Sequence, residues 1–246
     1  MKARDPLLLV AGLLVLWQLA YWAIGEVALR SPWQTVNALA QMVSNPRFTP
    51  HLAETLLAFA QGFVIAVAIG LTIGLTLGAS RLAGEVAEPV LVAAYSIPKV
   101  TLYPIILLLF GIGMPAKVAF GAIHGIVPIS LFAMNAVRNI PAIHLRTARV
   151  LHLPPLTLAG RILLPAALPE VFTGIRVGFS LTLIGTLLGE MFGAQRGLGF
   201  LLMQAMHLHR IESILALTLL LVLIAALANG LLLGIDRRLH QRQQAS

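Results

Sequence analysis

The sequence contains no cysteine, and this absence limits the kinds of site that the chain can build. Without cysteine there is no disulfide framework and no thiolate ligand for a metal ion. His207 and His209 form a His-x-His pair, but two imidazoles make at most half of an ordinary zinc site. We therefore predict that the chain holds no metal.

Charge is also scarce, because only 11% of the residues are charged while 59% are hydrophobic. An ordinary soluble domain has about 25% charged residues. The mean hydropathy is +0.91, and the apolar residues fall in long runs. A helix that crosses a bilayer takes roughly 20 apolar residues, so this composition indicates a membrane protein. The net charge of +8 does not indicate nucleic-acid binding, since basic residues are expected at the cytoplasmic ends of membrane helices.

Lysine occurs only at positions 2, 99 and 117, and none of these lysines follows a glycine. A phosphate-binding P-loop needs Gly-Lys followed by Ser or Thr, so the sequence excludes this route to ATP hydrolysis. The sequence also offers no paired nucleophile and base. We predict no catalytic residue and no cofactor in this chain.

Six apolar stretches predict an all-α, polytopic membrane protein with about six transmembrane helices, forming one domain over residues 1–246. The stretches cover about residues 6–25, 55–79, 86–110, 116–137, 166–190 and 213–235. The first stretch is nearer 20 residues than the 7–15 of a signal peptide, so we predict a retained helix.

Basic residues predict the orientation in the membrane. With the N-terminus inside, ten basic residues lie in cytoplasmic segments and five in outer segments. The ten are Lys2, Arg4, Arg81, Arg138, Arg146, Arg149, Arg161, Arg237, Arg238 and Arg242, and the five are Arg30, Arg47, Lys117, Arg196 and Arg210. The positive-inside rule therefore predicts cytoplasmic N- and C-termini.

Small residues recur at every fourth position of the second stretch and so share one helix face. They are Gly62, Ala66, Gly70, Gly74 and Gly78. Close backbone approach and van der Waals contact hold helices together in lipid, so we predict tight packing inside the bundle. A dimer seam or a moving helix pair is the alternative interpretation of this stripe.

The polar segment 139–162, between the fourth and fifth stretches, is interrupted by prolines. Pro141 suits the first turn of a helix. Pro154 and Pro155 stop that helix, because each disfavours α geometry in the residue before it. The pattern predicts a short helix over 142–151, a turn, and a second short helix over 156–163, both at the cytoplasmic surface.

This segment resembles the cytoplasmic coupling loop of ATP-binding-cassette (ABC) importer permeases. The family motif reads Glu-Ala-Ala, three residues, Gly, and further on Leu-Pro. Aligned on Leu164-Pro165, the triplet falls on "RTA" from Arg146 and the glycine falls on His152, so the acidic charge is reversed and the glycine is replaced. The stretches "SIPKVTLYPIILLLFGIG" and "LPAALPEVFTGIRVGFSLTLIGTLLGEMFGAQRGLGFLL" resemble the nitrate/sulfonate/taurine branch.

The resemblance implies a type I ABC importer permease fold with a cytoplasmic coupling helix, in the inner membrane of a bacterium. It implies that the chain forms a translocation path for a small anionic or aromatic solute. The implied partners are a second permease chain (identical or not), two ATP-binding subunits that hold ATP and Mg²⁺, and a periplasmic or lipid-anchored substrate-binding protein. The residues expected to couple to the ATPase are Arg146, Thr147, Ala148, Arg149, Leu151, His152 and Leu153.

Polar residues in the third and fifth stretches are the candidates for lining the path, since polar groups inside a membrane mark a path or a structural pair. They are Ser96, Lys99, Thr101, Ser180, Thr182, Thr186 and Glu190. An internal hydrogen bond, or for Lys99 a stem that snorkels to the surface, is the alternative for each. A stand-alone secondary transporter is the competing function, but it usually has internal repeats and ion-coupling residues, which are not seen here. The residues do not identify the solute.

Overall fold

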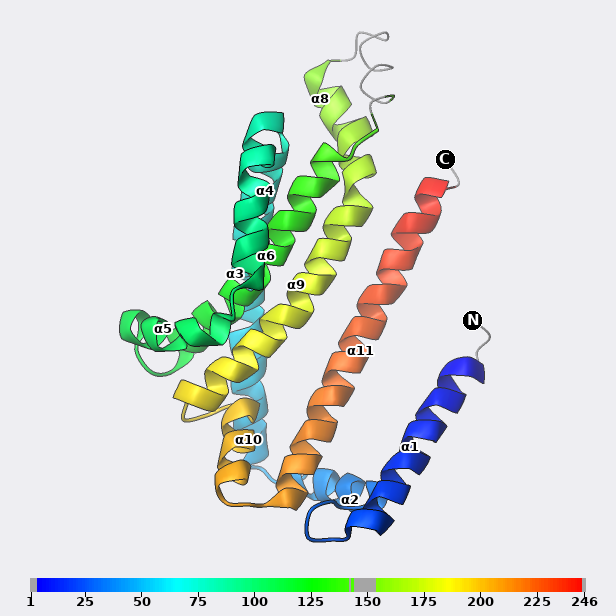
Figure 1. Cartoon of the computed structure of the whole chain (residues 1–246), viewed down its shortest axis with the longest axis vertical. Helices are drawn as coiled ribbons and strands as arrows, with labels where there is room; N and C mark the ends of the chain where they lie inside the picture. Colours follow the sequence, from blue (N-terminus) through cyan, green and yellow to red (C-terminus); the bar gives the residue numbers. More distant parts are fainter. Residues whose placement is uncertain (1–3, 142, 144–153, 245–246) are drawn as a thin grey trace.

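The computed structural model describes residues 4–141, 143 and 154–244, and the regular elements in these ranges are all helical (Figure 1). They are α1 (Arg4–Ile24), α2 (Pro32–Val43), α3 (Phe48–Gly78), α4 (Arg81–Ser96), the 3₁₀ turn η1 (Lys99–Leu102), α5 (Tyr103–Phe110), α6 (Met114–Arg138), α8 (Pro155–Leu158), the π turn η2 (Ala159–Leu163), α9 (Leu164–Gly193), α10 (Leu198–His207) and α11 (Ile211–Gln244). The all-α prediction is confirmed.

Four helical stretches are long and apolar enough to cross a membrane. They are α3, α6, the continuous helix Gly160–Gly193, and Ile211–Gly234 of α11. A fifth crossing is present if α4 and the helix after it count as one bent span. The remaining predicted stretch is α1, whose described apolar part, Leu8–Ile24, is shorter. The structure thus supports a multi-pass protein with four or five spans of full length, against the predicted number of about six.

The third predicted stretch, 86–110, is not one helix, because the chain bends by 83° between Arg81–Ser96 and Lys99–Phe110. Pro98 disfavours α geometry in the residue before it, and Ile97 is extended, with φ −63° and ψ 130°. After α5, Gly111 and Gly113 have φ of +72° and +118° and reverse the chain into α6.

The core is formed by α3, α6 and α9, which pack against one another along their lengths (Figure 1). Glycines allow this close approach on both sides of α6. On one side, Gly70 and Gly74 of α3 face α6, and on the other side Gly178 of α9 faces Ile129 of α6. Close backbone contact of this kind is what holds helices together in lipid.

Two short helices, α2 and α10, were not predicted from the sequence. Ser31 and Gln34 form a capping box at the start of α2, and Pro32 occupies its first turn. Figure 1 shows α2 lying across the end of the bundle, near the starts of α3 and α11. α10 follows Gly197, whose φ of +127° allows the sharp turn after α9.

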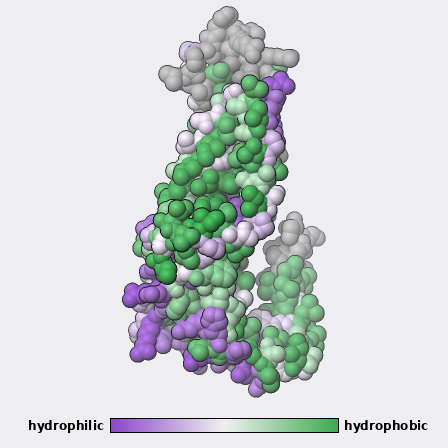
Figure 2. All heavy atoms as spheres, turned by 60° about the vertical axis from the view of Figure 1, so that its left-hand side comes forward, coloured by the Kyte–Doolittle hydropathy of each residue, from purple (hydrophilic) through white to green (hydrophobic). Residues whose placement is uncertain are grey.

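The two ends of the bundle differ. α1 starts and α11 finishes on the side toward which α8 points, whereas α2 and α10 lie at the opposite end (Figure 1). In the view of Figure 2, hydrophobic side chains cover much of the length and hydrophilic side chains gather at the end opposite α8. The second short helix predicted in the polar segment is present as α8 and η2, and it continues into α9. The first, 142–151, lies outside the described residues except for Ile143.

Candidate functional site

Four charged or polar residues gather where α3, α6 and α9 meet the start of α10. We call Glu54, Thr55, Lys117 and Glu190 the polar cluster. Lys117 is 1% exposed and Glu190 is fully buried. The Nζ of Lys117 lies 3.0 Å from Oε1 of Glu54 and 3.5 Å from Oε1 of Glu190. The Thr55 hydroxyl lies 2.8 Å from Oε2 of Glu190, so the buried carboxylate has both an ionic and a hydrogen-bonding partner.

The polar cluster also binds the backbone of the α9–α10 turn. The N–H of Gly199 donates to Oε2 of Glu190 at 3.0 Å, and the N–H of Leu198 donates to the Thr55 hydroxyl at 2.8 Å. Lys117 donates to the carbonyl of Arg196 at 3.2 Å. The first N–H groups of a helix have no partner within the helix, and the cluster supplies partners for those of α10. The cluster therefore fastens the α9–α10 turn to α3 and α6.

The polar cluster holds the helices and the α9–α10 turn in place and does not offer an unpaired charge to a ligand. Its ammonium lies within 3.5 Å of both carboxylates, so the charges are paired rather than directed at an open space. Among the described residues, no three His, Asp or Glu side chains gather as a set that could hold a metal ion.

The candidate path residues on α9 fall into two places. Thr182, Thr186 and Glu190 share a buried face, and the hydroxyls of both threonines have no hydrogen-bond partner among the described atoms. A side chain added at Gly121 or at Gly125 of α6 would meet these threonines. Ser180 lies elsewhere, with its hydroxyl 3.1 Å from Oδ1 of Asn229 on α11.

The remaining candidates lie at the bend between α4 and α5. The hydroxyl of Ser96 donates to the carbonyl of Val92 at 3.0 Å, and that of Thr101 donates to the carbonyl of Pro98 at 2.8 Å. Lys99 donates to the carbonyl of Tyr95 at 3.1 Å. None of these hydrogen bonds reaches α9, so within one chain the candidates do not form a single site. Their assignment to a path stays a prediction.

The small-residue stripe of α3 lies against α6 of the same chain. All five of its residues are buried, and they are Gly62, Ala66, Gly70, Gly74 and Gly78. A Cβ built on Gly70 would lie 2.8 Å from the Cβ of Ile129, and one on Gly78 would lie 2.7 Å from the carbonyl oxygen of Met134. The geometry is that of close packing inside the bundle.

The predicted ATPase-coupling residues lie outside the described residues. They are Arg146, Thr147, Ala148, Arg149, Leu151, His152 and Leu153. Their role stays a prediction.

Sequence reasoning missed the partners of Glu190. Lys117 was assigned to an outer segment, whereas it lies inside α6 and is buried. The available signal was that Glu54, Lys117 and Glu190 all lie at the outer ends of apolar stretches in the predicted topology. There the charge of the lysine is opposite to that of the two glutamates.

Residues 66–244 match the family described as the binding-protein-dependent transport system inner membrane component. The chain belongs to this family of permeases. The permease is 31% identical to a probable ABC transporter permease protein of Haemophilus influenzae, with 98% of each chain covered. It is 35% identical to the riboflavin transport system permease protein RibX of Chloroflexus aurantiacus, covering 95% of this chain and 88% of the relative.

Similarity to the sulfonate and taurine branch is confirmed by the taurine transport system permease protein TauC of Escherichia coli. The permease is 25% identical to TauC, covering 94% of this chain and 86% of the relative. The fold is similar to that of a chain in an inward-facing structure of the MetNI methionine ABC transporter. That match has a TM-score of 0.60 and 21% identity, and it covers 85% of this chain and 97% of that chain.

These comparisons confirm the predicted fold and function. The permease is a multi-pass inner-membrane subunit of an ABC importer, and it is not itself an enzyme. Importers of this kind act together with an ATPase and a substrate-binding protein. Nothing in the comparisons supports a stand-alone secondary transporter.

Proposed function

We propose that this permease receives the work of ATP hydrolysis through residues 139–162 and forms, with a second permease chain, the path for a solute delivered by a binding protein. Two ATP-binding subunits bind ATP and Mg²⁺, because this chain has no Gly-Lys-Ser/Thr sequence to hold phosphates. The N- and C-termini lie in the cytoplasm.

The observation that carries this proposal is where the chain enters and leaves the polar segment. α6 finishes and α8 begins at the same end of the bundle, the end toward which the start of α1 and the finish of α11 point (Figure 1). From α8 the chain continues through η2 into α9, with Gly160–Gly193 as one helix. A displacement of the segment would therefore act directly on α6 and α9, which pack against each other along the core.

The surroundings of the segment support a docking role. The guanidinium of Arg138, at the end of α6, lies 2.7 Å from Oε2 of Glu88 and fastens this end to α4. A cavity of about 620 Å³ lies between the α3–α4 turn, the end of α6 and Leu163. Arg81 and Arg138 line it, and basic residues at this end favour the cytoplasmic side.

The exposed apolar surface of α5 supports the proposal that a second permease chain is present. Leu108, Leu109 and Ile112 are 87%, 72% and 71% exposed. Leu108 and Leu109 lie in α5, and Ile112 lies in the turn that follows, between Gly111 and Gly113, which have positive φ. The bend at Pro98 and this turn place irregular backbone before and after α5. Irregular backbone is tolerated within the hydrocarbon only where protein or a water-filled cavity covers it, so we place the second chain, identical or not, on this surface.

The solute class follows from the branch to which the permease is similar. Its relatives are named for the transport of riboflavin and of taurine, an aromatic compound and a small sulfonate. We propose a small organic anion or aromatic compound, selected mainly by the binding protein.

The test is retention of the ATPase by Ala148→Asp, because a charge placed in an apolar contact is costly when it is left unpaired. Ala28→Asp is the matched control, since Ala28 is exposed in the α1–α2 connection, far from the segment. We expect Ala148→Asp to insert normally but to lose the ATPase in a mild-detergent purification, and Ala28→Asp to retain it. Ala148→Asp that still binds the ATPase and transports at the wild-type rate would contradict the proposal.

A further inference from the structure

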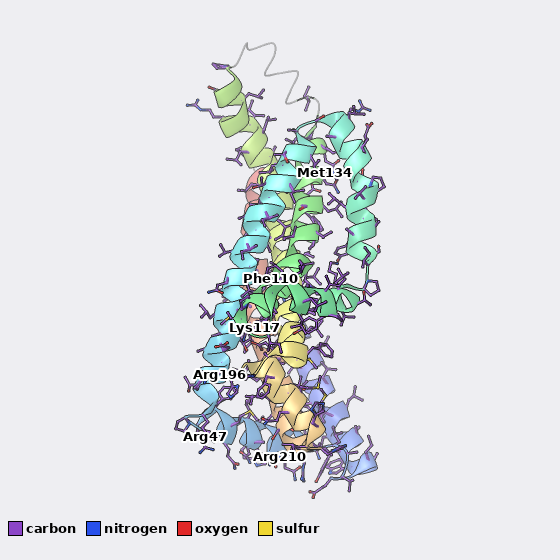
Figure 3. All side chains as sticks on the ribbon, turned by 90° about the vertical axis from the view of Figure 1, so that its left-hand side faces the viewer. Arg47, Phe110, Lys117, Met134, Arg196 and Arg210 are labelled. Atoms are coloured by element: carbon purple, nitrogen blue, oxygen red, sulfur yellow. The ribbon has the colours of Figure 1, made fainter. Side chains whose placement is uncertain are left out.

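A cavity of about 390 Å³ lies at the end of the molecule opposite α8, between the α2–α3 turn, α10 and the start of α11. Its floor is apolar and includes Phe48 and Leu217, both buried. Its rim carries Arg47 and Arg210, both exposed, and Figure 3 shows the two arginines at this same end. The cavity therefore combines a positively charged rim with an apolar floor.

The two rim arginines are available for a ligand. Within the described part of the chain, no carboxylate forms a salt bridge with Arg47 or Arg210, and neither guanidinium has a hydrogen bond. No acidic residue lines the cavity. His51 also lines it, and Nδ1 of His51 accepts the N–H of Gly197 at 3.1 Å, which leaves Nε2 as a donor. The polar groups of the rim thus suit an anion.

The cavity lies at the level expected for lipid headgroups. The apolar run of α11 begins at Ile214, so Arg210 lies about 6 Å beyond it along the helix direction, at 1.5 Å per residue. α2 crosses this end of the bundle with Trp33 72% exposed, and exposed tryptophan is typical of a membrane–water interface.

We propose that this cavity binds an anionic phospholipid, with the headgroup phosphodiester between Arg47 and Arg210. Arginine pairs well with phosphate oxygens because its planar guanidinium offers several donors in a fixed geometry. The apolar floor continues along α3 and α11 through the partly buried Leu52, Leu221 and Ile224, which the acyl chains would follow. A carboxylate from a docked protein would pair with the arginines but would leave this apolar floor unused, so the cavity favours a lipid.

The test uses the full-length chain purified in detergent and offered equal amounts of phosphatidylglycerol and phosphatidylcholine with the same acyl chains. Native mass spectrometry then counts the lipid that is retained. We expect the wild type to prefer phosphatidylglycerol, because both lipids carry the phosphodiester but the choline cation of phosphatidylcholine would be repelled by the two arginines. We expect Arg47→Gln/Arg210→Gln to lose about 25-fold in that preference, at about fivefold per arginine. Arg196→Gln is the matched control, because Arg196 is exposed near the same end but does not line the cavity (Figure 3).

Further measurements distinguish a lipid from a free phosphate or a docked protein as the source of the anion. Retention of wild-type preference by the double variant would overturn the proposal, and so would displacement of the lipid by glycerol phosphate or inorganic phosphate at equal concentration. A double variant that keeps its lipid but no longer responds to the binding protein would assign the arginines to protein docking instead. If the double variant elutes or melts abnormally, Arg47→Gln and Arg210→Gln alone are measured, with about fivefold expected for each.

Discussion

Gly74 packs α3 against α6 so closely that one added methyl group should destabilise the permease. In Gly74→Ala the new Cβ would lie 2.6 Å from the Cβ of Ala133, 3.0 Å from the backbone N of Met134, and against the carbonyl oxygen of Ser130. Carbon atoms in contact prefer about 3.5–4.0 Å, so the two helices must separate by about 1 Å. These neighbours are backbone and Cβ atoms, and no side-chain rotation relieves the contact.

The size of the effect follows from two opposing contributions. Extra methylene groups in a packed core cost about 1–3 kcal/mol. Alanine is the better helix former by about 1 kcal/mol, which offsets part of this cost. Separation of the helices would also loosen the contacts that Gly70 and Gly78 make with α6. We therefore expect Gly74→Ala to lower the free energy of unfolding by about 1–2 kcal/mol, in the range that overpacked cores show, and Gly74→Leu to prevent normal assembly.

The assay is unfolding in mixed micelles by titration with a denaturing detergent, followed by circular dichroism. Gly230→Ala is the control, because Gly230 lies in α11 with nothing within 4 Å of an added Cβ. Gly230→Ala should be as stable as the wild type or slightly more stable. If Gly74→Ala and Gly230→Ala unfold alike, the reasoning about the α3–α6 contact is refuted.

The polar cluster and the turn that it holds give two further predictions. Lys117→Met leaves the buried Glu190 carboxylate without its cation, so the same titration should show a loss of about 3–5 kcal/mol in the free energy of unfolding. Lys117→Met/Glu190→Gln should recover part of this loss, and a double variant less stable than the single one would contradict the pairing. Gly197→Ala forces an L side chain to a φ of +127° and against the Glu190 carboxylate, so this variant should unfold at a lower concentration of denaturing detergent than Gly12→Ala, whose added Cβ meets open space. Equal stability of the two variants would contradict this account of the turn.

The helices and the stripe were predictable because both depend on local information. An apolar run of about 20 residues is visible in the sequence alone, and so is a glycine at every fourth position. The break near Pro98 also follows from a local rule, although the 83° bend that divides the third stretch does not. α2 and α10 were missed because 12 and 10 residues are too few to stand out in a search for membrane-spanning runs.

The polar cluster required information that no local pattern contains. Glu54, Lys117 and Glu190 come from three different helices, and their pairing depends on how α3, α6 and α9 align in depth. The same holds for Thr182 and Thr186, since packing against α6 decides whether a polar face of α9 meets protein or solute. Sequence reasoning identified Glu190 and these threonines as notable, but it could not identify their neighbours.

The central claim, that residues 139–162 contact the ATPase, is tested most directly by site-specific cross-linking. The chain has no cysteine, so Ala148→Cys introduces the only thiol in this subunit and can carry a maleimide-linked photoreactive group. The account predicts a covalent permease–ATPase product from position 148 and none from Ala28→Cys at the opposite end. Absence of that product from position 148, while the ATPase remains bound to the permease, would contradict the account.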